Sequence, residues 1–377
     1  MNTIFTIGIF LSLFLAFLLF TKRNKTLSDT VLSIWMLFIS IHLLSYNLYY
    51  LGYWKVYPHL VGLTHPFPLL HGPFLYLYVV FSLRSDQKFR RKDMLHFLPF
   101  VIDYLGMFPF IFGYTAQQKL LMDSQDINSE YQWFFIISLV SFVISGITYP
   151  VLSYRKITKY QQLINDNFAY EEGISLRWLK VFIMGLGIIF LVGTIIILMR
   201  EVFQIDFGFN SDLIIFVLIV LLVFLIGFSG IRYQGIFTEK AIKEHSIVEV
   251  KTVSEYRKSG LKSDEVAQLH QEMLSLMEEK KPYLEPKLTL NQLAEQLAIS
   301  SNNLSQVINQ CEGKNFYDFV NSYRVDEFIK RATNDKNKGL NLLGIALDSG
   351  FNSKSSFNQV FKKHTGDTPS NYLKNNI

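Results

Sequence analysis

The sequence of 377 residues contains one cysteine and little net charge, and both scarcities limit what the chain can be. A single cysteine, Cys311, cannot form an intrachain disulfide, which is typical of proteins in a reducing compartment. A catalytic thiol is one interpretation of Cys311, but we expect a small buried or half-buried residue. The formal net charge of +5 permits a nucleic-acid partner without predicting one.

The motifs of common enzyme classes are also missing. The chain has no HExxH, GxSxG or GxxxxGK[ST] motif and no paired cysteines at metal-ligand spacing, and its eight histidines are scattered. We therefore expect a protein that is not an enzyme and that binds no cofactor and no metal. The first apolar run has no basic residue before it, so it does not resemble a cleaved signal peptide.

Charge is distributed unevenly along the chain. Residues 1–231 carry 29 charged side chains, whereas the shorter remainder, residues 232–377, carries 38. The first part contains seven apolar runs, each near the ~20 residues that cross a bilayer as a helix. They are residues 2–20, 30–50, 63–83, 94–114, 132–154, 179–199 and 213–231. The sequence therefore predicts a seven-span transmembrane domain over residues 1–231.

Lysine and arginine in the short loops predict the orientation of this domain. Thirteen of these residues lie in alternate loops, around residues 22–25, 84–92 and 155–180. The opposite loops hold only three, namely Lys55, Lys119 and Arg200. Because positively charged loops stay in the cytoplasm, we expect the N-terminus outside and residues 232–377 in the cytoplasm.

Two features within the spans are candidates for sensing a signal. The third run contains three prolines, which break or delay a helix, close to His65 and His71. These histidines could bind a ligand or sense pH, or they could cap and pack. Asp103 is an ionisable residue inside the fourth run, where such residues are usually functional, although it could simply pair with a buried polar neighbour.

The polar part of the chain begins with a linker and continues as helices. Residues 232–263 mix charges and lack an apolar period, so we interpret them as a tether. A helix is expected from Asp264 and ends before Pro282. Two short helices then follow Thr289, in LNQLAEQLA and SNNLSQVINQ, and the short turn between them makes a helix-turn-helix.

The same pattern occurs again near the C-terminus. NLLGIALDSGF predicts a helix that ends at Gly350, where positive φ is cheap, and NSKSSFNQVFKKH predicts the next helix. Residues 316–334 between the two units predict a helix of ~28 Å, which approaches the ~34 Å between successive major-groove faces. The second helix of each unit carries polar side chains that we expect to face outward: Asn302, Asn303, Ser305 and Gln306, then Ser353, Lys354, Ser355, Asn358, Gln359 and Lys362.

Residues 264–377 resemble the DNA-binding domain of the AraC/XylS family of bacterial transcription factors. The resemblance rests on LTLNQLAEQLAIS, NFYDFVNSYRV and IALDSGFNSKSSFNQVFKKHTGDTPSNYL. It implies recognition helices near residues 301–310 and 353–363, which read two successive major grooves of double-stranded DNA. It also implies that the outward-facing polar side chains of these two helices, named above, bind the DNA. Leu373 stands where many members have arginine. The better-known members carry a soluble sugar-binding domain in front, whereas this chain has seven spans in its place.

The sequence thus predicts an all-α protein with a seven-helix transmembrane bundle, a cytoplasmic linker over residues 232–263 and a double helix-turn-helix domain over residues 264–377. Its expected function is a membrane-anchored transcription regulator in the bacterial cytoplasmic membrane, which couples an unknown small-molecule or envelope signal to gene expression. A homodimer is compatible with this function. The alternative is a transporter or channel-like protein with a cytoplasmic regulatory domain, which would predict internal repeats; we find no convincing one.

Overall fold

The computed structural model describes residues 2–84, 88–124, 132–172, 176–232, 263–334 and 341–376. Within these ranges every regular element is a helix, and the one bridge is an isolated antiparallel pair of Phe168 and Thr289. The expected all-α class is confirmed. The chain divides into two compact units, one of Met1–Thr158 with Leu176–Lys240 and the other of Lys159–Ser175 with Ala241–Ile377.

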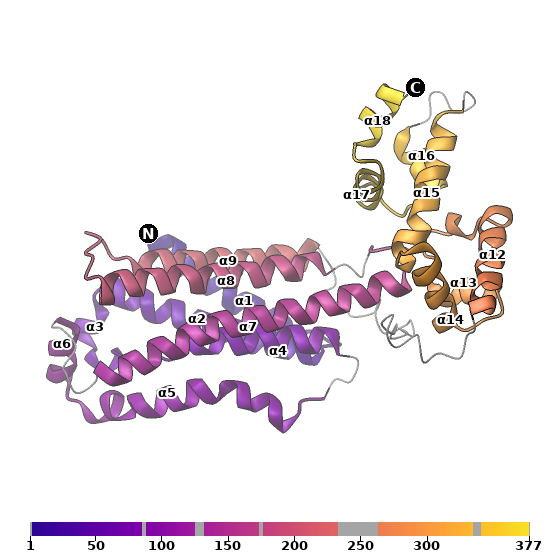
Figure 1. The fold of residues 1–377 in the computed structure, drawn as a ribbon. Helices are drawn as coiled ribbons and strands as arrows, with labels where there is room; N and C mark the ends of the chain where they lie inside the picture. The colour runs from indigo at the N-terminus through magenta and orange to yellow at the C-terminus, as the bar shows by residue number, and fades with distance from the viewer. Residues whose placement is uncertain are drawn as a thin grey trace. The chain divides into compact units, whose positions relative to one another are not determined.

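The first unit is a bundle of apolar helices (Figure 1). Helices α1 and α2 pack against each other, and so do α8 and α9. Helix α7 runs through the boundary at residue 158, so its last residues belong to the second unit. The elements in chain order are α1 (Asn2–Thr21), α2 (Leu27–Tyr50), α3 (Tyr53–Val56), η1 (Pro58–Leu60), α4 (Pro68–Leu83), η2 (Arg91–Phe97), α5 (Leu98–Phe108), η3 (Pro109–Gly113), α6 (Ala116–Ser124), α7 (Gln132–Asn167), α8 (Arg177–Ile197), η4 (Leu198–Val202) and α9 (Asp212–Arg232).

Six helices of the described residues are long and apolar enough to cross a membrane. They are Thr3–Thr21, Leu27–Tyr50, Arg91–Gly113, Ile136–Asn167, Trp178–Arg200 and Asp212–Ser229, and each overlaps one of the seven expected runs. The remaining run differs, because its helix α4 has 16 residues and rises only ~24 Å. Its prolines explain the late start, since Pro68 can occupy the first turn of a helix but Pro66 is left in the turns before it.

The outer surface of the bundle is apolar. Helix α1 buries Phe5 and Leu19 on one side and exposes Phe10, Phe14 and Phe17 on the other. Large aromatic side chains that lie together on an exposed face suit a hydrocarbon environment rather than water.

The second unit holds the predicted helix-turn-helix elements. In Figure 1, α15 lies between α12, α13 and α14 at one end and α16, α17 and α18 at the other. The elements are α12 (Ser263–Glu279), η6 (Pro282–Leu284), α13 (Leu290–Gln296), α14 (Ser301–Val307), η7 (Ile308–Glu312), α15 (Phe316–Ala332), α16 (Leu342–Asp348), α17 (Lys354–Thr365) and α18 (Pro369–Asn376). Almost all of the expected tether, residues 232–263, lies outside the described residues.

Two hydrophobic cores stabilise the second unit. The first joins α12, α13, α14 and the start of α15, and it includes Met273, Leu293 and Leu304. The second joins the later part of α15 to α16 and α17, and it includes Phe328 and Phe357. Because α15 contributes to both cores, it connects the two helix-turn-helix units through side-chain packing as well as through the chain.

Candidate DNA-reading helices

Helices α13 and α14 form the first helix-turn-helix. The Thr289 hydroxyl accepts a hydrogen bond from the backbone N–H of Gln292 at 3.2 Å, and the Gln292 side chain accepts one from the N–H of Thr289 at 2.9 Å. This capping box stabilises the first turn of α13. Ala298 turns the chain with φ +55°, and the Ser300 side chain caps α14. The predicted unit is therefore confirmed.

The outward face expected for α14 is only partly present. Asn302 is exposed and Asn303 is partly exposed. Ser305 and Gln306 are each 3% exposed, so their expected outward position is wrong in this structure. A two-helix pattern considers only the packing of α14 on α13, whereas α14 also packs against α12, which precedes the unit. The Ser305 carbonyl accepts a hydrogen bond from the Asn309 side chain at 2.8 Å.

Helices α16 and α17 form the second helix-turn-helix, as predicted. Asn341 caps α16, and Ser353 caps α17 by accepting a hydrogen bond from the N–H of Ser356 at 3.3 Å. Between them Gly350 has φ +95°, and a Cβ at this position would collide with the carbonyl oxygen of Tyr283. Glycine is therefore required both by the backbone conformation and by the close approach of another segment.

Helix α17 has the expected two faces. Phe357, Val360 and Phe361 are buried in the second core. Five of the six side chains predicted to bind DNA here are exposed: Lys354, Ser355, Asn358, Gln359 and Lys362. The sixth, Ser353, is partly exposed and is the N-cap of the helix. The exposed set combines amide, hydroxyl and ammonium groups, which can donate hydrogen bonds to base edges and phosphates.

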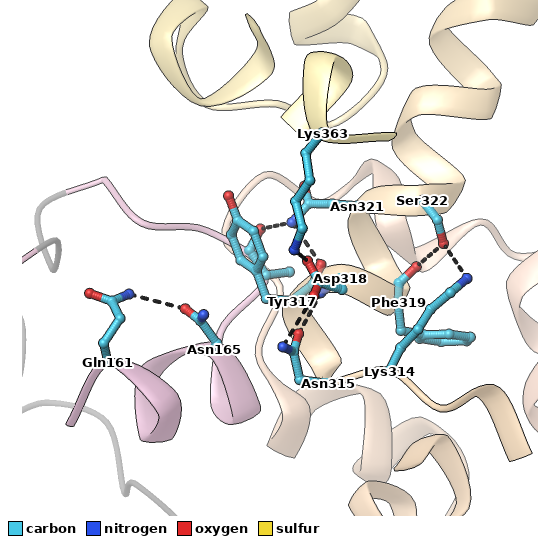
Figure 2. Close-up of polar contacts among 11 residues, drawn as sticks. Gln161, Asn165, Lys314, Asn315, Tyr317, Asp318, Phe319, Asn321, Ser322 and Lys363 are labelled. Atoms are coloured by element: carbon cyan, nitrogen blue, oxygen red, sulfur yellow. Dashed lines mark hydrogen bonds and ion pairs between the residues drawn. The ribbon is translucent and has the colours of Figure 1, made fainter. Parts of the chain in front are cut away.

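Lys363, the neighbour of Lys362, forms an ion pair with Asp318 of the linker helix α15. Figure 2 shows its side chain reaching Asp318 at the beginning of α15, with Nζ 2.6 Å from Oδ1. Asp318 is itself held by Asn315, whose side-chain oxygen accepts from the Asp318 N–H at 2.7 Å. Lys363 is exposed and Asp318 is partly exposed, so the ion pair stabilises the fold only weakly. It does, however, draw Lys363 toward α15.

A buried arginine in the middle of α15 is a feature that the sequence pattern did not reveal. Arg324 is 1% exposed. Its Nε donates to the carbonyl of Tyr283 at 2.7 Å, Nη2 to that of Glu285 at 2.7 Å, and Nη1 to that of Ala169 at 2.6 Å. Burial lowers the pKa of Arg324 to about 10, so the guanidinium stays charged at neutral pH. The sequence signal is slight: one arginine directly after Tyr323 of the apolar stripe.

A second polar cluster lies one helical turn further along α15. Glu327 accepts hydrogen bonds from Arg331 at 2.7 Å, Lys281 at 3.2 Å and Tyr283 at 3.3 Å. Burial alone would raise the pKa of Glu327, but the bonds from Arg331 and Lys281 outweigh it and hold the pKa below the ordinary value. Burial, together with the charge of Glu327, raises the pKa of Tyr283 to about 12.

The candidate sensing histidines have different surroundings. His71 is buried, and its Nδ1 accepts a hydrogen bond from the indole N–H of Trp35 at 3.0 Å. Its Nε2 is 3.3 Å from Nδ1 of His42 on α2. Because an indole only donates, Nδ1 of His71 carries no proton, and Nε2 is the donor to His42. His65 is exposed, and its ring centroid is 6.5 Å from that of Phe134.

Asp103 is buried in α5 and accepts a hydrogen bond from the hydroxyl of Ser138 on α7. Asp103 therefore pairs with a buried polar neighbour, which was one of the two interpretations of this residue in the sequence. Among the described residues no group of three or more His, Cys, Asp or Glu side chains could hold a metal ion.

Cys311 is exposed, which contradicts the expectation of a buried or half-buried residue. It lies in η7, the short π-helix that directly follows α14, where the chain leaves the first core. Partial burial of the sulfur and the charge of Glu312 raise the pKa of the thiol. A raised pKa leaves little thiolate at neutral pH, which argues against a nucleophile.

A protein-family profile described as a helix-turn-helix domain matches residues 293–375, from α13 to α18. These residues therefore form a helix-turn-helix domain. No curated protein matches the chain. The chain is similar to a solved structure of a protein of unknown function from Listeria innocua, with 33% identity over 28% of this chain and 93% of that one and a TM-score of 0.24.

Proposed function

We propose that this chain is a membrane-anchored, sequence-specific DNA-binding transcription regulator of the AraC/XylS type. One observation carries the proposal: two helix-turn-helix units share one linker helix, and the second presents the exposed polar face of α17. Helix α15 has 17 residues and rises ~25 Å, a suitable spacer between reading helices that enter successive major grooves.

The exposed side chains of α17 favour a particular base composition. Asn358 and Gln359 have amides that can bond adenine in two places, and Lys354 suits guanine or phosphate. Arginine, the usual reader of guanine, is absent from α17. The proposed sites therefore lean toward A·T pairs, and a binding-site selection that returned G·C-rich sequences would refute this preference.

The second unit, which holds both helix-turn-helices and which we call the DNA-reading unit, is proposed to lie in the cytoplasm. The excess of lysine and arginine in alternate loops supports it. The second unit combines residues 159–172 with residues after 262, so the location proposed for one segment applies to both. Among the described residues between these two segments, α8 and α9 are the helices long and apolar enough to cross a membrane. Two crossings return the chain to the same side, so both parts of the unit share one compartment.

We propose that the signal acts on the first unit. His71 is the preferred sensing candidate, because it is buried and both of its ring nitrogens have a polar partner. A proton added at its Nδ1 would face the indole N–H of Trp35 and break that hydrogen bond. We expect His71→Phe to change the response of a reporter gene to pH or to envelope stress while DNA binding by the purified chain persists. An unchanged reporter response would remove His71 from the sensing site.

The experiment that tests the proposed function is a binding-site selection with the full chain in lipid nanodiscs at one stated salt concentration. We expect sites with two boxes about one helical turn apart. Lys354→Ala combined with Asn358→Ala should weaken specific binding by ~10-fold or more, since each base contact is worth ~1–3 kcal/mol. Ser370→Ala, an exposed change on α18, is the matched control. Binding that is sequence-blind and equally strong in both variants would refute the proposal.

A further inference from the structure

The segment that follows α7 is built into the DNA-reading unit, although α8 and α9 separate the two in the chain. Phe168 forms the antiparallel bridge with Thr289, and the N–H of Ala169 donates to the carbonyl of Leu288 at 3.1 Å. Thr289 is the N-cap of α13, so this contact holds the start of the first helix-turn-helix. Ala169 is 1% exposed and belongs to the first hydrophobic core.

The carbonyl of Ala169 contacts the linker helix. Its oxygen accepts hydrogen bonds from Nη1 of Arg324 at 2.6 Å and from the Asn321 side chain at 3.2 Å. The same Asn321 amide donates to the carbonyl of Tyr317 within α15, as Figure 2 shows. Arg324 and Asn321 are both buried. Ala169 therefore contacts the first helix-turn-helix through its N–H and α15 through its carbonyl.

Arg324 extends this contact to the second helix-turn-helix. Its Nε donates to the carbonyl of Tyr283, and Gly350 packs against both of these groups. Gly350 lies in the turn between α16 and α17, so the turn that positions α17 rests on the buried guanidinium. Arg324 is therefore in contact with Ala169, with the segment before α13 and with the turn before α17.

We propose that Phe168 and Ala169 form a clip through which α7 sets the alignment of the two DNA-reading helices, so that a signal in the membrane domain changes the affinity for two-box DNA. This inference rests on the proposed function. Helix α7 is continuous from Gln132 to Asn167, begins in the first unit and ends at the clip. If the clip withdraws, two buried donors lose their shared acceptor, one of them on a charged group, and α15 must rearrange.

The test compares two-box and single-box DNA duplexes, taken from the binding-site selection, with the full chain in lipid nanodiscs. Ala169→Trp places a bulky side chain in a buried position of the clip without changing either reading helix. Asn321→Asp keeps the shape of the side chain but removes its donation to Ala169. Gln162→Trp introduces the same bulky group at an exposed position of α7 and is the matched control.

We expect Ala169→Trp and Asn321→Asp to weaken binding to two-box DNA by about tenfold or more, with single-box binding within about twofold of wild type, a coupling of ordinary allosteric size. Gln162→Trp should change neither. Unchanged two-box binding in both clip variants would overturn the inference. Loss of single-box binding as well would also overturn it, because the segment would then stabilise the reading units rather than align them. A wild-type chain with no specific binding to either duplex would instead refute the proposed function.

Discussion

Replacing Arg324 with leucine should destabilise the DNA-reading unit more than any surface change. The substitution keeps much of the apolar volume of the side chain but removes the three short hydrogen bonds to the carbonyls of Tyr283, Glu285 and Ala169. The Tyr283 carbonyl then loses its donor, at a cost of about 1–3 kcal/mol. The Ala169 and Glu285 carbonyls keep bonds from the Asn321 side chain and the Leu288 N–H, and each loses a bond to a charged group worth about 1.5–3 kcal/mol. Part of this is offset, because the cost of burying the guanidinium charge also disappears. We therefore expect a loss of about 3–5 kcal/mol, which is a large part of the stability of a typical domain.

Hydrogen–deuterium exchange of the α15 amides measures this loss in the full chain in nanodiscs. A change of about 3–5 kcal/mol corresponds to a loss of protection of roughly 10²- to 10⁴-fold. Arg331→Leu is the matched control, since Arg331 lies on the same helix, is 32% exposed and donates to Glu327 at 2.7 Å. Its removal should cost no more than about 1 kcal/mol. Equal protection in the two variants would show that the buried arginine does not hold the unit together.

Three further predictions concern the same unit. Gly366→Ala should cost only the ~1–2 kcal/mol of left-handed backbone strain, because a Cβ at Gly366 meets nothing within 4 Å. Gly350→Ala should cost more, because a Cβ at Gly350 also collides with a carbonyl. Equal melting temperatures of the two variants would contradict this. Lys362→Ala should reduce the slope of the logarithm of the DNA-binding constant against the logarithm of the salt concentration by about 0.9. Lys363→Ala should reduce this slope less, because Lys363 is paired with Asp318. DNA titrations at four salt concentrations measure both slopes, and equal reductions would contradict the prediction. Glu327 has a lowered pKa, so the stability that its charge contributes is present above the ordinary pKa of 4.5 and is lost as the pH falls through the lower folded-state pKa. In denaturation curves, the difference in unfolding free energy between wild type and Glu327→Gln should therefore shrink from pH 7 to pH 3. A constant difference would refute the linkage.

The amino-acid sequence by itself determined the elements of this protein. Apolar runs of about 20 residues can satisfy their backbone groups in lipid only as helices, so the helices of the first unit follow from composition and length. Local chemistry likewise placed the start of the first helix-turn-helix at Thr289 and the turn of the second at Gly350, because each needs only its immediate neighbours in the chain. The exposed face of α17 follows in the same way from its helical period. The cap at Ser353, a residue predicted to bind DNA, was found only in the structure.

Only the tertiary structure decided which side chains are buried by distant segments and which partners they contact. The burial of Ser305 and Gln306 is not readable from the period of α14, since a helix that packs against more than one neighbour is covered over a wider arc. His71 meets His42, rather than His65 from its own run, because α2 packs against α4. Above all, the membership of Ala169 in the DNA-reading unit rests on hydrogen bonds to side chains more than 150 residues away. Backbone N–H and C=O groups are the same at every residue, so no sequence pattern identifies which carbonyl a buried arginine will bind.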